Sequence, residues 1–248
     1  MGKLANKVAL VTGSSRGIGA AIAERLAADG AAVAVNYVKA ADAAERVAER
    51  IRAAGGKAIV LQGDVGDWSQ AKSLVERTAS ELGRFDILVN NAADIAIQFA
   101  EKITEDEVHR MIRVNVEGPI ATTQAAVAHF PEEGGRIINI SSLSAFAPSD
   151  GSPVYGATKG AIEVFTAQCA FEFGRRGITV NAVAPGLTET DAQREKLPAD
   201  AAAAIAERTP LRRLGQPADI ADVVAFVASP DARWVTGQVI RATGGLIP

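Results

Sequence analysis

The sequence has few of the residues from which disulfide-rich, zinc-binding and membrane-spanning proteins are built. Its 248 residues include one cysteine, Cys169, which has no partner for an internal disulfide and predicts a reducing compartment, the cytoplasm. Only two histidines, His109 and His129, accompany that cysteine, so the zinc ligands are poor and we expect no metal. No apolar run approaches the roughly 20 residues of a membrane span, and no secretory leader precedes the first apolar segment.

An excess of positive charge is also missing. The chain has 26 Lys and Arg against 29 Asp and Glu, a formal charge of −3, which argues against a nucleic-acid-binding surface. With 48% hydrophobic and 22% charged residues, it has the composition of an ordinary globular chain that buries a core without disulfides. Glycine is in surplus, because the chain has 23 where average usage gives about 17. These glycines therefore need an explanation.

Short apolar segments alternate with longer segments of helical periodicity. Strands are expected at Lys7–Thr12, Ala32–Tyr37, Ala58–Gln62, Phe85–Asn90, Arg136–Ser141, Ile178–Val183 and Val235–Arg241. Helices are expected at Ile18–Ala28, Ala40–Ala54, Trp68–Leu82, Glu105–His129, Val154–Arg175 and Pro217–Ala228. Nearly continuous apolar strands between helices are typical of a parallel sheet covered on both faces. We predict an α/β fold, one doubly wound Rossmann-type domain over residues 1–248 with a seven-stranded parallel sheet, and a substrate lid at 188–208.

Glycines gather where the first strand meets the first helix. Glycine at such a junction allows a tight turn and lets the backbone approach a pyrophosphate, which the helix N-terminus attracts. The alternative is a tight turn without a ligand. Its position between a strand and a helix favours a dinucleotide-binding loop, formed by Gly13, Ser15, Arg16, Gly17, Ile18 and Gly19.

The end of the second strand indicates which dinucleotide binds. The segment Val35–Lys39 has no carboxylate to bond the ribose 2′-hydroxyl of NAD. Arg16 would instead pair with the 2′-phosphate of NADP, with Lys39 as a second candidate. We therefore expect NADP(H) to be favoured over NAD(H), with Asn36 in the binding site. A solvated lysine at a helix start is the simpler role for Lys39.

A tyrosine and a lysine four residues apart begin the helix expected at Val154–Arg175. Tyr155 and Lys159 therefore share one helix face. A positive charge about 4 Å from a phenol, at an effective dielectric of about 20, is worth about 4 kcal/mol and lowers the pKa of the phenol by up to about 3 units. Lys159 would thus make Tyr155 a usable acid and base. The same spacing also occurs on ordinary helices, so the pair gains meaning only from its context.

That context resembles the classical short-chain dehydrogenase/reductase family from the first strand to Gly244-Gly245. The motifs are Thr12–Gly19, Asn90–Ala93, Asn115, Ser141-Ser142, Tyr155 with Lys159, and Pro185–Thr190. The resemblance implies that Ser142 bonds the substrate oxygen and that Tyr155 transfers the proton. It further implies that Lys159 lowers the tyrosine pKa and binds the nicotinamide ribose, and that Asn115 holds a water of a proton relay.

The resemblance also implies further cofactor contacts. Asp64 and Val65 would contact the adenine, Asn90 and Ala92 would lie at the end of the fourth strand, and the nicotinamide carboxamide would be held by Pro185, Gly186, Thr188 and Thr190. Two positions depart from the family pattern. Ala93 stands where the family has glycine, which puts the loop path in question, and Thr243 stands where it has aspartate.

The expected function is an NADP(H)-dependent oxidoreductase that interconverts a carbonyl and a secondary alcohol by direct hydride transfer, with tyrosine as acid and base. The candidate substrate residues are Asp94, Ser144, Phe146, Asp150 and Leu187. A small or cyclic ketone or a polyol-type substrate is favoured. The alternative is a 3-oxoacyl-[acyl-carrier-protein] reductase, against which Glu132 and Glu133 argue because the carriers are acidic. A non-catalytic nucleotide-binding scaffold is a further alternative, and an epimerase or dehydratase would need a longer chain.

Three other features have simpler readings. Cys169 is expected to be a small buried residue. Arg208, Arg212 and Arg213 would either clamp an anionic substrate or form a solvated cluster, which we favour. The resemblance implies a homotetramer, built through the helices expected at Glu105–His129 and Val154–Arg175 and through the last strand.

Overall fold

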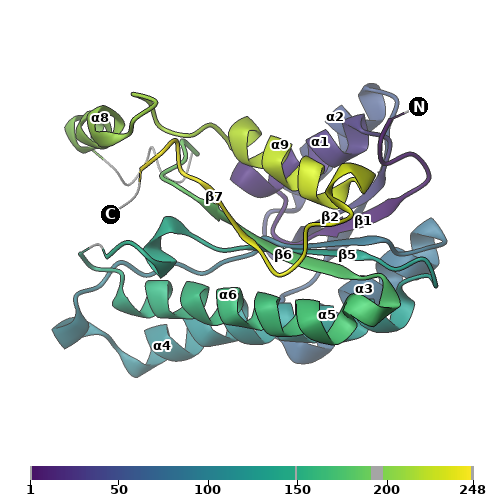
Figure 1. Cartoon of the computed structure of the whole chain (residues 1–248), viewed down its shortest axis with the longest axis horizontal. Helices are drawn as coiled ribbons and strands as arrows, with labels where there is room; N and C mark the ends of the chain where they lie inside the picture. The colour runs from purple at the N-terminus through teal and green to yellow at the C-terminus, as the bar shows by residue number, and fades with distance from the viewer. Residues whose placement is uncertain (1, 149, 191–197, 247–248) are drawn as a thin grey trace.

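A seven-stranded parallel sheet forms the centre of the computed structural model, which describes residues 2–148, 150–190 and 198–246 (Figure 1). Its strand order is β3-β2-β1-β4-β5-β6-β7, and every neighbouring pair is parallel. The strands are β1 Val8–Val11, β2 Ala32–Tyr37, β3 Lys57–Gln62, β4 Ile87–Asn90, β5 Arg136–Ile140, β6 Thr179–Pro185 and β7 Val239–Ala242. The predicted fold class is confirmed, although β7 begins four residues later than expected.

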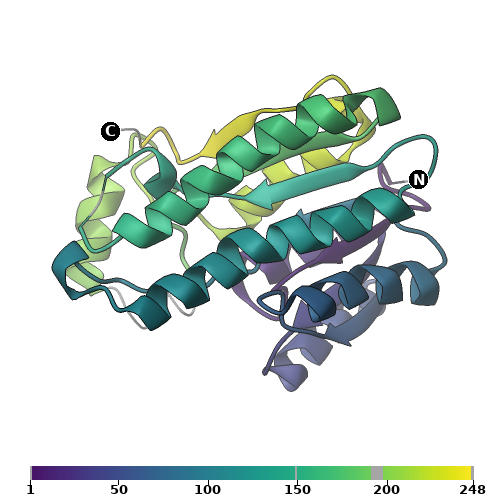
Figure 2. The same ribbon diagram turned by 90° about the horizontal axis from the view of Figure 1, so that it is seen from below.

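Helices cover both faces of this sheet (Figures 1 and 2). One face is covered by α1 Gly17–Ala28, α2 Ala41–Ala53 and α9 Pro217–Ala228. The other is covered by α3 Trp68–Leu82, α5 Gly118–His129 and α6 Pro153–Phe173. Two further helices, α4 Glu105–Ile112 and α8 Ala199–Arg208, lie towards the end of the molecule at which the strands terminate. Among the described residues, no helix has the length and apolarity needed to cross a membrane.

The two layers explain why the strands are apolar throughout. In β1, Ala9 and Val11 pack into the core under α1, α2 and α9, while Val8 and Leu10 pack into the core under α3 and α5. Successive side chains of a strand point to opposite faces, so a sheet covered on both sides needs apolar residues at every position. Cys169 lies in the second core and is 5% exposed, as expected for a small buried residue.

The helix expected at Glu105–His129 is divided by a π-helical segment. It begins as α4, passes through a π-helix at Arg113–Glu117 and continues as α5. A π-segment adds a residue to a turn and is often found at functional sites, and this one places Asn115 in the interior, 1% exposed. The hydrophobic period of the sequence shows no such insertion, so the interruption was not predicted.

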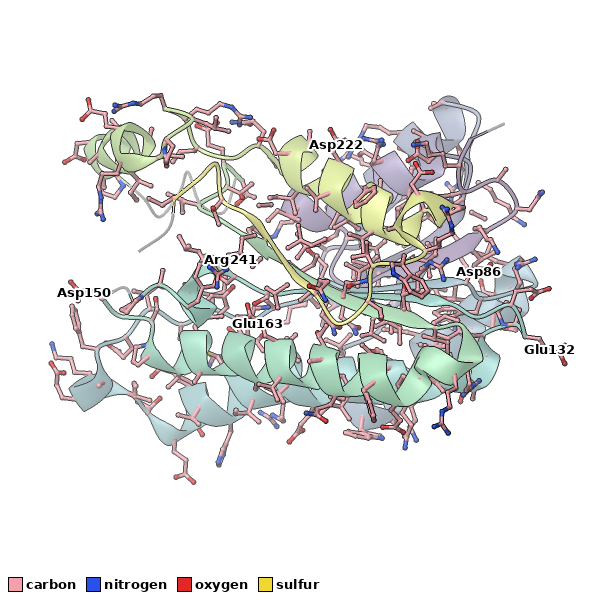
Figure 3. The ribbon with its side chains drawn as sticks, viewed as in Figure 1. Asp86, Glu132, Asp150, Glu163, Asp222 and Arg241 are labelled. Atoms are coloured by element: carbon pink, nitrogen blue, oxygen red, sulfur yellow. The ribbon has the colours of Figure 1, made fainter. Side chains whose placement is uncertain are left out.

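Strand order reverses at β1, which pairs with β2 on one side and β4 on the other. In doubly wound sheets, ligands bind at this switch point, outside the carboxyl ends of the strands. At the opposite end, Asp86 is 3% exposed (Figure 3). Burial alone would raise the pKa of this carboxyl, but hydrogen bonds from Arg84, Val8 and Lys7 hold it below its usual value. These bonds fasten β1 to the start of β4 and leave the carboxyl ends open for a ligand.

Candidate active site

A cavity of about 1160 Å³ opens at the carboxyl ends of the strands. The predicted cofactor residues that line it are Gly13, Ser15, Arg16, Gly17, Ile18, Gly19, Asp64, Val65, Ala92, Pro185, Gly186, Thr188 and Thr190. Ser142, Tyr155 and Lys159 line the same cavity, as do the candidate substrate residues Asp94, Ser144 and Leu187. The fold thus brings together residues from the first strand to the last third of the chain.

The glycine loop fits a ligand that approaches the backbone closely. Gly13 has a φ of +61°, and a Cβ there would lie 2.9 Å from the Cα of Ala92. A Cβ on Gly19 would lie 2.5 Å from the Nδ2 of Asn91. Asn91, which the sequence analysis did not single out, donates from that nitrogen to the carbonyl oxygens of Thr12 and Gly13, at 2.8 and 3.1 Å. The loop therefore has no room for side chains at these glycines.

The N-terminus of α1 is free to bind an anion. Its N-cap residue, Arg16, makes no side-chain capping bond, and its first turn has no acidic residue. Backbone N–H groups and the helix dipole at such an end attract phosphate. Arg16 and Lys39 are exposed and line the cavity, and neither forms an ion pair with an acidic side chain of the described residues. These groups fit the pyrophosphate and a further phosphate of a dinucleotide.

Asn36 does not line the cavity, contrary to the role predicted for it. It is 1% exposed, and its Oδ1 accepts a hydrogen bond from the backbone N–H of Gly13 at 2.9 Å. Its Nδ2 donates to the carbonyl oxygens of Leu61 and Gly63, at 3.2 and 3.0 Å. Asn36 therefore holds the glycine loop against β2 and β3 from below. The residues after it, Tyr37 to Ala40, line the cavity instead.

Asn90 is likewise buried beneath the site, 5% exposed, and does not line the cavity. It donates from Nδ2 to the Oδ1 of Asn139 at 2.9 Å and accepts a bond from the Thr122 hydroxyl at 2.7 Å. These bonds join β4 to β5 and α5. The sequence alone could not show that these asparagines are buried, because both lie at the carboxyl end of a strand, where ligand contacts are also expected.

Two candidate substrate residues lie outside the cavity lining. Phe146 packs under the guanidinium of Arg241 on β7, with the Cζ atom 3.8 Å from the ring centroid. Asp150 is exposed at the tip of the loop before α6 (Figure 3). The sequence placed both residues near the site because they lie between Ser142 and Tyr155, but the residues of this segment that line the cavity are Leu143, Ser144, Ala147, Pro148 and Ser152.

The three candidate catalytic side chains in the cavity come from two elements. Tyr155 and Lys159 lie on α6, and Ser142 follows the end of β5. Burial raises the pKa of Tyr155, and a hydrogen bond with Ser142 acts in the opposite direction. Lys159 is 3% exposed, donates from Nζ to the carbonyl oxygen of Ile140 at 2.7 Å, and lies 5.6 Å from the centroid of the Tyr155 ring.

The expected lowering of the tyrosine pKa by the lysine is therefore absent from this structure. Burial lowers the pKa of Lys159 itself to about 8. Its ammonium bonds a backbone carbonyl and not the phenol, so desolvation dominates at Tyr155 and the phenol stays protonated at neutral pH. At neutral pH the site therefore contains a protonated phenol, which can act as an acid towards a group that binds next to it.

Asn115 does not line the cavity, but it holds two of its walls together. Its Oδ1 accepts from the backbone N–H of Asp94 at 2.8 Å, and its Nδ2 donates to the carbonyl oxygen of Asp94 at 2.9 Å. The same Nδ2 donates to the Thr158 hydroxyl at 3.1 Å, which in turn donates to the carbonyl oxygen of Tyr155 at 2.7 Å. The loop after β4 and the start of α6 are thereby fixed relative to each other.

The remainder of the cavity is largely apolar, with a few polar groups at its edge. Apolar lining residues that the sequence analysis missed are Ile97, Leu143, Ala147, Pro148, Ile205 and Leu246. Asp94 is paired with Arg110. Ala93, one of the departures from the family pattern, is exposed in the lining, while Thr243 is 8% exposed and its Cα would lie 3.0 Å from a Cβ on Gly186.

Part of the lid expected at 188–208 contributes to this region. Residues 191–197 lie outside the described part of the chain, whereas α8 supplies Ile205 and Arg208 to the lining. The other two arginines of the triplet lie away from it: Arg212 donates to the carbonyl oxygen of Glu207, and Arg213 pairs with Asp219. These two belong to a solvated surface, and only Arg208 faces the cavity.

Comparison with known proteins identifies relatives along the whole chain. A family model described as enoyl-(acyl carrier protein) reductase matches residues 13–247. An uncharacterized oxidoreductase of Methylorubrum extorquens is 49% identical, covering 99% of this chain and 100% of its own. Versicolorin reductase 1 of Aspergillus parasiticus is 42% identical, covering 98% of this chain and 97% of its own.

The fold and the sequence agree with solved structures as well. The crystal structure of an angucycline C-6 ketoreductase with bound NADP superposes with a TM-score of 0.93 at 42% identity, covering 98% of this chain and 96% of that one. A short-chain dehydrogenase of Burkholderia cenocepacia in complex with NADP gives 0.90 at 43% identity, covering 98% of both chains. With this fold, the glycine loop and the Ser142, Tyr155 and Lys159 side chains in one cavity, the chain belongs to the classical short-chain dehydrogenase/reductase family.

Proposed function

We propose that this protein is an NADP(H)-dependent oxidoreductase that interconverts a ketone and a secondary alcohol by direct hydride transfer. The observation that supports this proposal most is that Ser142, Tyr155 and Lys159 line the same cavity as the glycine loop. A dinucleotide whose phosphates bind at α1 would extend towards these side chains. A scaffold that only binds nucleotides has no need for a buried lysine beside a half-buried tyrosine that lines the cavity.

Each side chain has a separate role in the proposed reaction. A bound NADPH supplies the hydride to the carbonyl carbon. Tyr155 donates its phenolic proton to the carbonyl oxygen as the alcohol forms, and Ser142 donates a hydrogen bond to the same oxygen. Lys159 holds a positive charge near the phenolate that remains, until a proton from solvent restores it. Asn115 keeps the loop after β4 and α6 in place.

The shape and lining of the cavity support a small or cyclic ketone as substrate. Ile95, Ile97, Leu187 and Ile205 supply apolar walls, and such walls suit a hydrocarbon ring better than the hydroxyl groups of a polyol. Ser144 and Ser152 are the neutral polar groups nearest to Tyr155 in the sequence that line the cavity, and they would orient a substituent. The related ketoreductases are consistent with this class of substrate.

A screen of NADPH oxidation tests the proposed function. The panel contains cyclic and aromatic ketones, open-chain ketones, sugars and 3-oxoacyl thioesters, and the consumption of NADPH is followed by absorbance. We expect the highest kcat/KM with cyclic ketones. Turnover confined to acyl thioesters would support the alternative, a 3-oxoacyl-[acyl-carrier-protein] reductase, and no turnover with any carbonyl would support the nucleotide-binding scaffold.

Arg16 is expected to determine the preference for NADP(H). Its guanidinium lies at the cavity edge without an acidic partner in the described residues, so it is available to a 2′-phosphate. Arg16→Ala should lower kcat/KM for NADPH by about tenfold, the value of one or two charge-assisted hydrogen bonds. The kcat/KM for NADH should stay the same. Lys39→Ala is the matched control and should change the ratio of kcat/KM for NADPH to kcat/KM for NADH less than Arg16→Ala does. A wild-type protein that prefers NADH would contradict the proposal.

We also infer a homotetramer in the cytoplasm. Large apolar side chains are exposed on the outer side of α6 and before β7, where Val164 is 63%, Phe171 91% and Trp234 96% exposed. Such exposure favours contacts between copies of the chain. Light scattering at micromolar concentration should give four times the mass of one chain, and the mass of a monomer would contradict the inference.

A further inference from the structure

The end of β5 is fastened to α6 by hydrogen bonds from three consecutive residues. These bonds are Asn139 Nδ2 to Thr166 Oγ1 at 2.9 Å, Lys159 Nζ to the Ile140 carbonyl oxygen at 2.7 Å, and Ser141 Oγ to Glu163 Oε1 at 2.7 Å. Ser142 follows directly, so this strand end determines where its hydroxyl lies. Tyr155 and Lys159 lie on the helix at the other side of the same bonds.

Glu163 is the member of this set that the proposed mechanism does not use. It lies one helical turn after Lys159 and two turns after Tyr155, at the boundary of the face of α6 that packs on the sheet (Figure 3). Its partner, Ser141, is 2% exposed and also lines the cavity. Because the half-buried Glu163 carboxylate accepts a hydrogen bond from the buried Ser141 hydroxyl, it fixes the distance between the end of β5 and α6.

We propose that Glu163 is a positioning residue for the reaction proposed above: by accepting the hydrogen bond of Ser141, it fixes the strand end so that the Ser142 hydroxyl meets the Tyr155 phenol. This inference rests on the proposed function only for its effect on turnover. Without substrate, Ser142 already lies close enough to the Tyr155 phenol to oppose in part the rise that burial causes in its pKa.

Glu163 acts here through its oxygen and not through its charge. The Lys159 ammonium bonds the carbonyl oxygen of Ile140, and the Glu163 carboxylate accepts from the Ser141 hydroxyl, so the two side chains have separate partners. Glutamine has the same carbonyl oxygen at the same distance from the backbone and should keep the bond. Alanine has no acceptor and leaves the buried Ser141 hydroxyl without its partner.

The experiment compares Glu163→Ala, Glu163→Gln and Ser141→Ala with Glu172→Ala, which removes an exposed carboxylate from the same helix. Glu163→Ala should lower kcat for ketone reduction by about tenfold, because a misplacement of about 1 Å at a catalytic group already has effects of this size. The KM for NADPH should change by less than about twofold. Glu163→Gln should retain most of the turnover. Ser141→Ala should match Glu163→Ala, and the double variant should be no worse than either one.

A titration without cofactor provides the second measurement. The absorbance of tyrosinate is followed with pH, and subtracting the titration of the corresponding Tyr155→Phe protein isolates Tyr155 from Tyr37, the other tyrosine of the chain. Glu163→Ala and Ser141→Ala should each raise the pKa of Tyr155, because Ser142 no longer donates to it in the same geometry, whereas Glu172→Ala should not.

The outcomes separate the two proposals. If the wild-type protein reduces no ketone, the proposed function fails, and the titration still decides the role of Glu163. An unchanged Tyr155 pKa in both Glu163→Ala and Ser141→Ala would overturn the positioning role, as would equal losses of kcat in Glu163→Ala and Glu172→Ala. If Glu163→Ala does not fold, Ser141→Ala and Glu163→Gln supply the same comparison.

Discussion

Tyr155→Phe is expected to lower kcat for ketone reduction by about 10³-fold, the usual contribution of a positioned general acid. The substitution removes one oxygen and leaves the ring, whose centroid lies 5.6 Å from the Nζ of Lys159. The phenol holds its proton at neutral pH, since burial raises its pKa further above neutrality, and it lines the cavity together with Ser142, so it has a proton to give to the substrate oxygen. Without it, the proton must come from water.

The loss should appear in kcat and not in cofactor binding. The residues that fit the pyrophosphate, Gly13 to Gly19, belong to the turn from β1 into α1, whereas Tyr155 lies on α6, and no hydrogen bond of the described residues joins that loop to the phenol oxygen. NADPH binding, followed by the change in its fluorescence, should therefore give a dissociation constant within about twofold of the wild type. A Tyr155→Phe protein that retains a tenth or more of the wild-type kcat would exclude Tyr155 as the proton donor.

Lys159→Met should abolish most of the turnover and yet make the protein more stable. The ammonium is 3% exposed, and burial lowers its pKa from the usual 10.5 to about 8. A pKa difference of this size corresponds to a burial cost of about 3 kcal/mol at pH 7. The variant also loses the hydrogen bond to the Ile140 carbonyl oxygen, and this loss cancels about 1 to 2 kcal/mol of the stability gained by removing the buried charge. The net gain, about 1 to 2 kcal/mol, should raise Tm by roughly 4 °C.

The pH dependence of this gain gives a further check on its cause. Because the folded-state pKa of Lys159 lies below the unfolded value, the wild type carries the full burial cost below pH 8. Between about pH 8 and pH 10, the folded protein loses this proton while the unfolded chain keeps it, so the cost disappears. The difference in Tm between Lys159→Met and wild type should shrink across this range. Lys102→Met, at an exposed lysine, is the control and should leave Tm unchanged; a lower Tm for Lys159→Met at pH 7 would contradict the account.

Local features of the chain were sufficient to predict the architecture. Strands β1 to β6 and the long helical segments lie where the apolar runs and helical periods place them, apart from the π-helical segment Arg113–Glu117, because each strand is buried on both faces and each helix on one. The glycine loop could be predicted for the same reason: Gly13 and Gly19 are confined by Ala92 and Asn91, and only glycine fits such contacts. Tyr155 and Lys159 were found because helical spacing puts them on one face.

The tertiary structure decided the roles of residues that act across the sequence. Asn36 and Asn90 were predicted to contact the cofactor and Asn115 to hold a water, but each is buried and bonds a distant backbone or side-chain group. Ile205 and Arg208 join the cavity although they lie far along the chain. Spacing indicates which residues neighbour one another along an element, and it contains no information on which elements meet.

The pKa values of the catalytic pair show the same division. The sequence by itself determined that a phenol and an ammonium share one face of a helix. The tertiary structure decided that Lys159 is buried and Tyr155 half-buried, and that the ammonium bonds the Ile140 carbonyl oxygen, so desolvation raises the pKa of Tyr155 and lowers that of Lys159 to about 8. Desolvation depends on every atom packed around a group, and those atoms come from strands and loops that only the folded chain brings together.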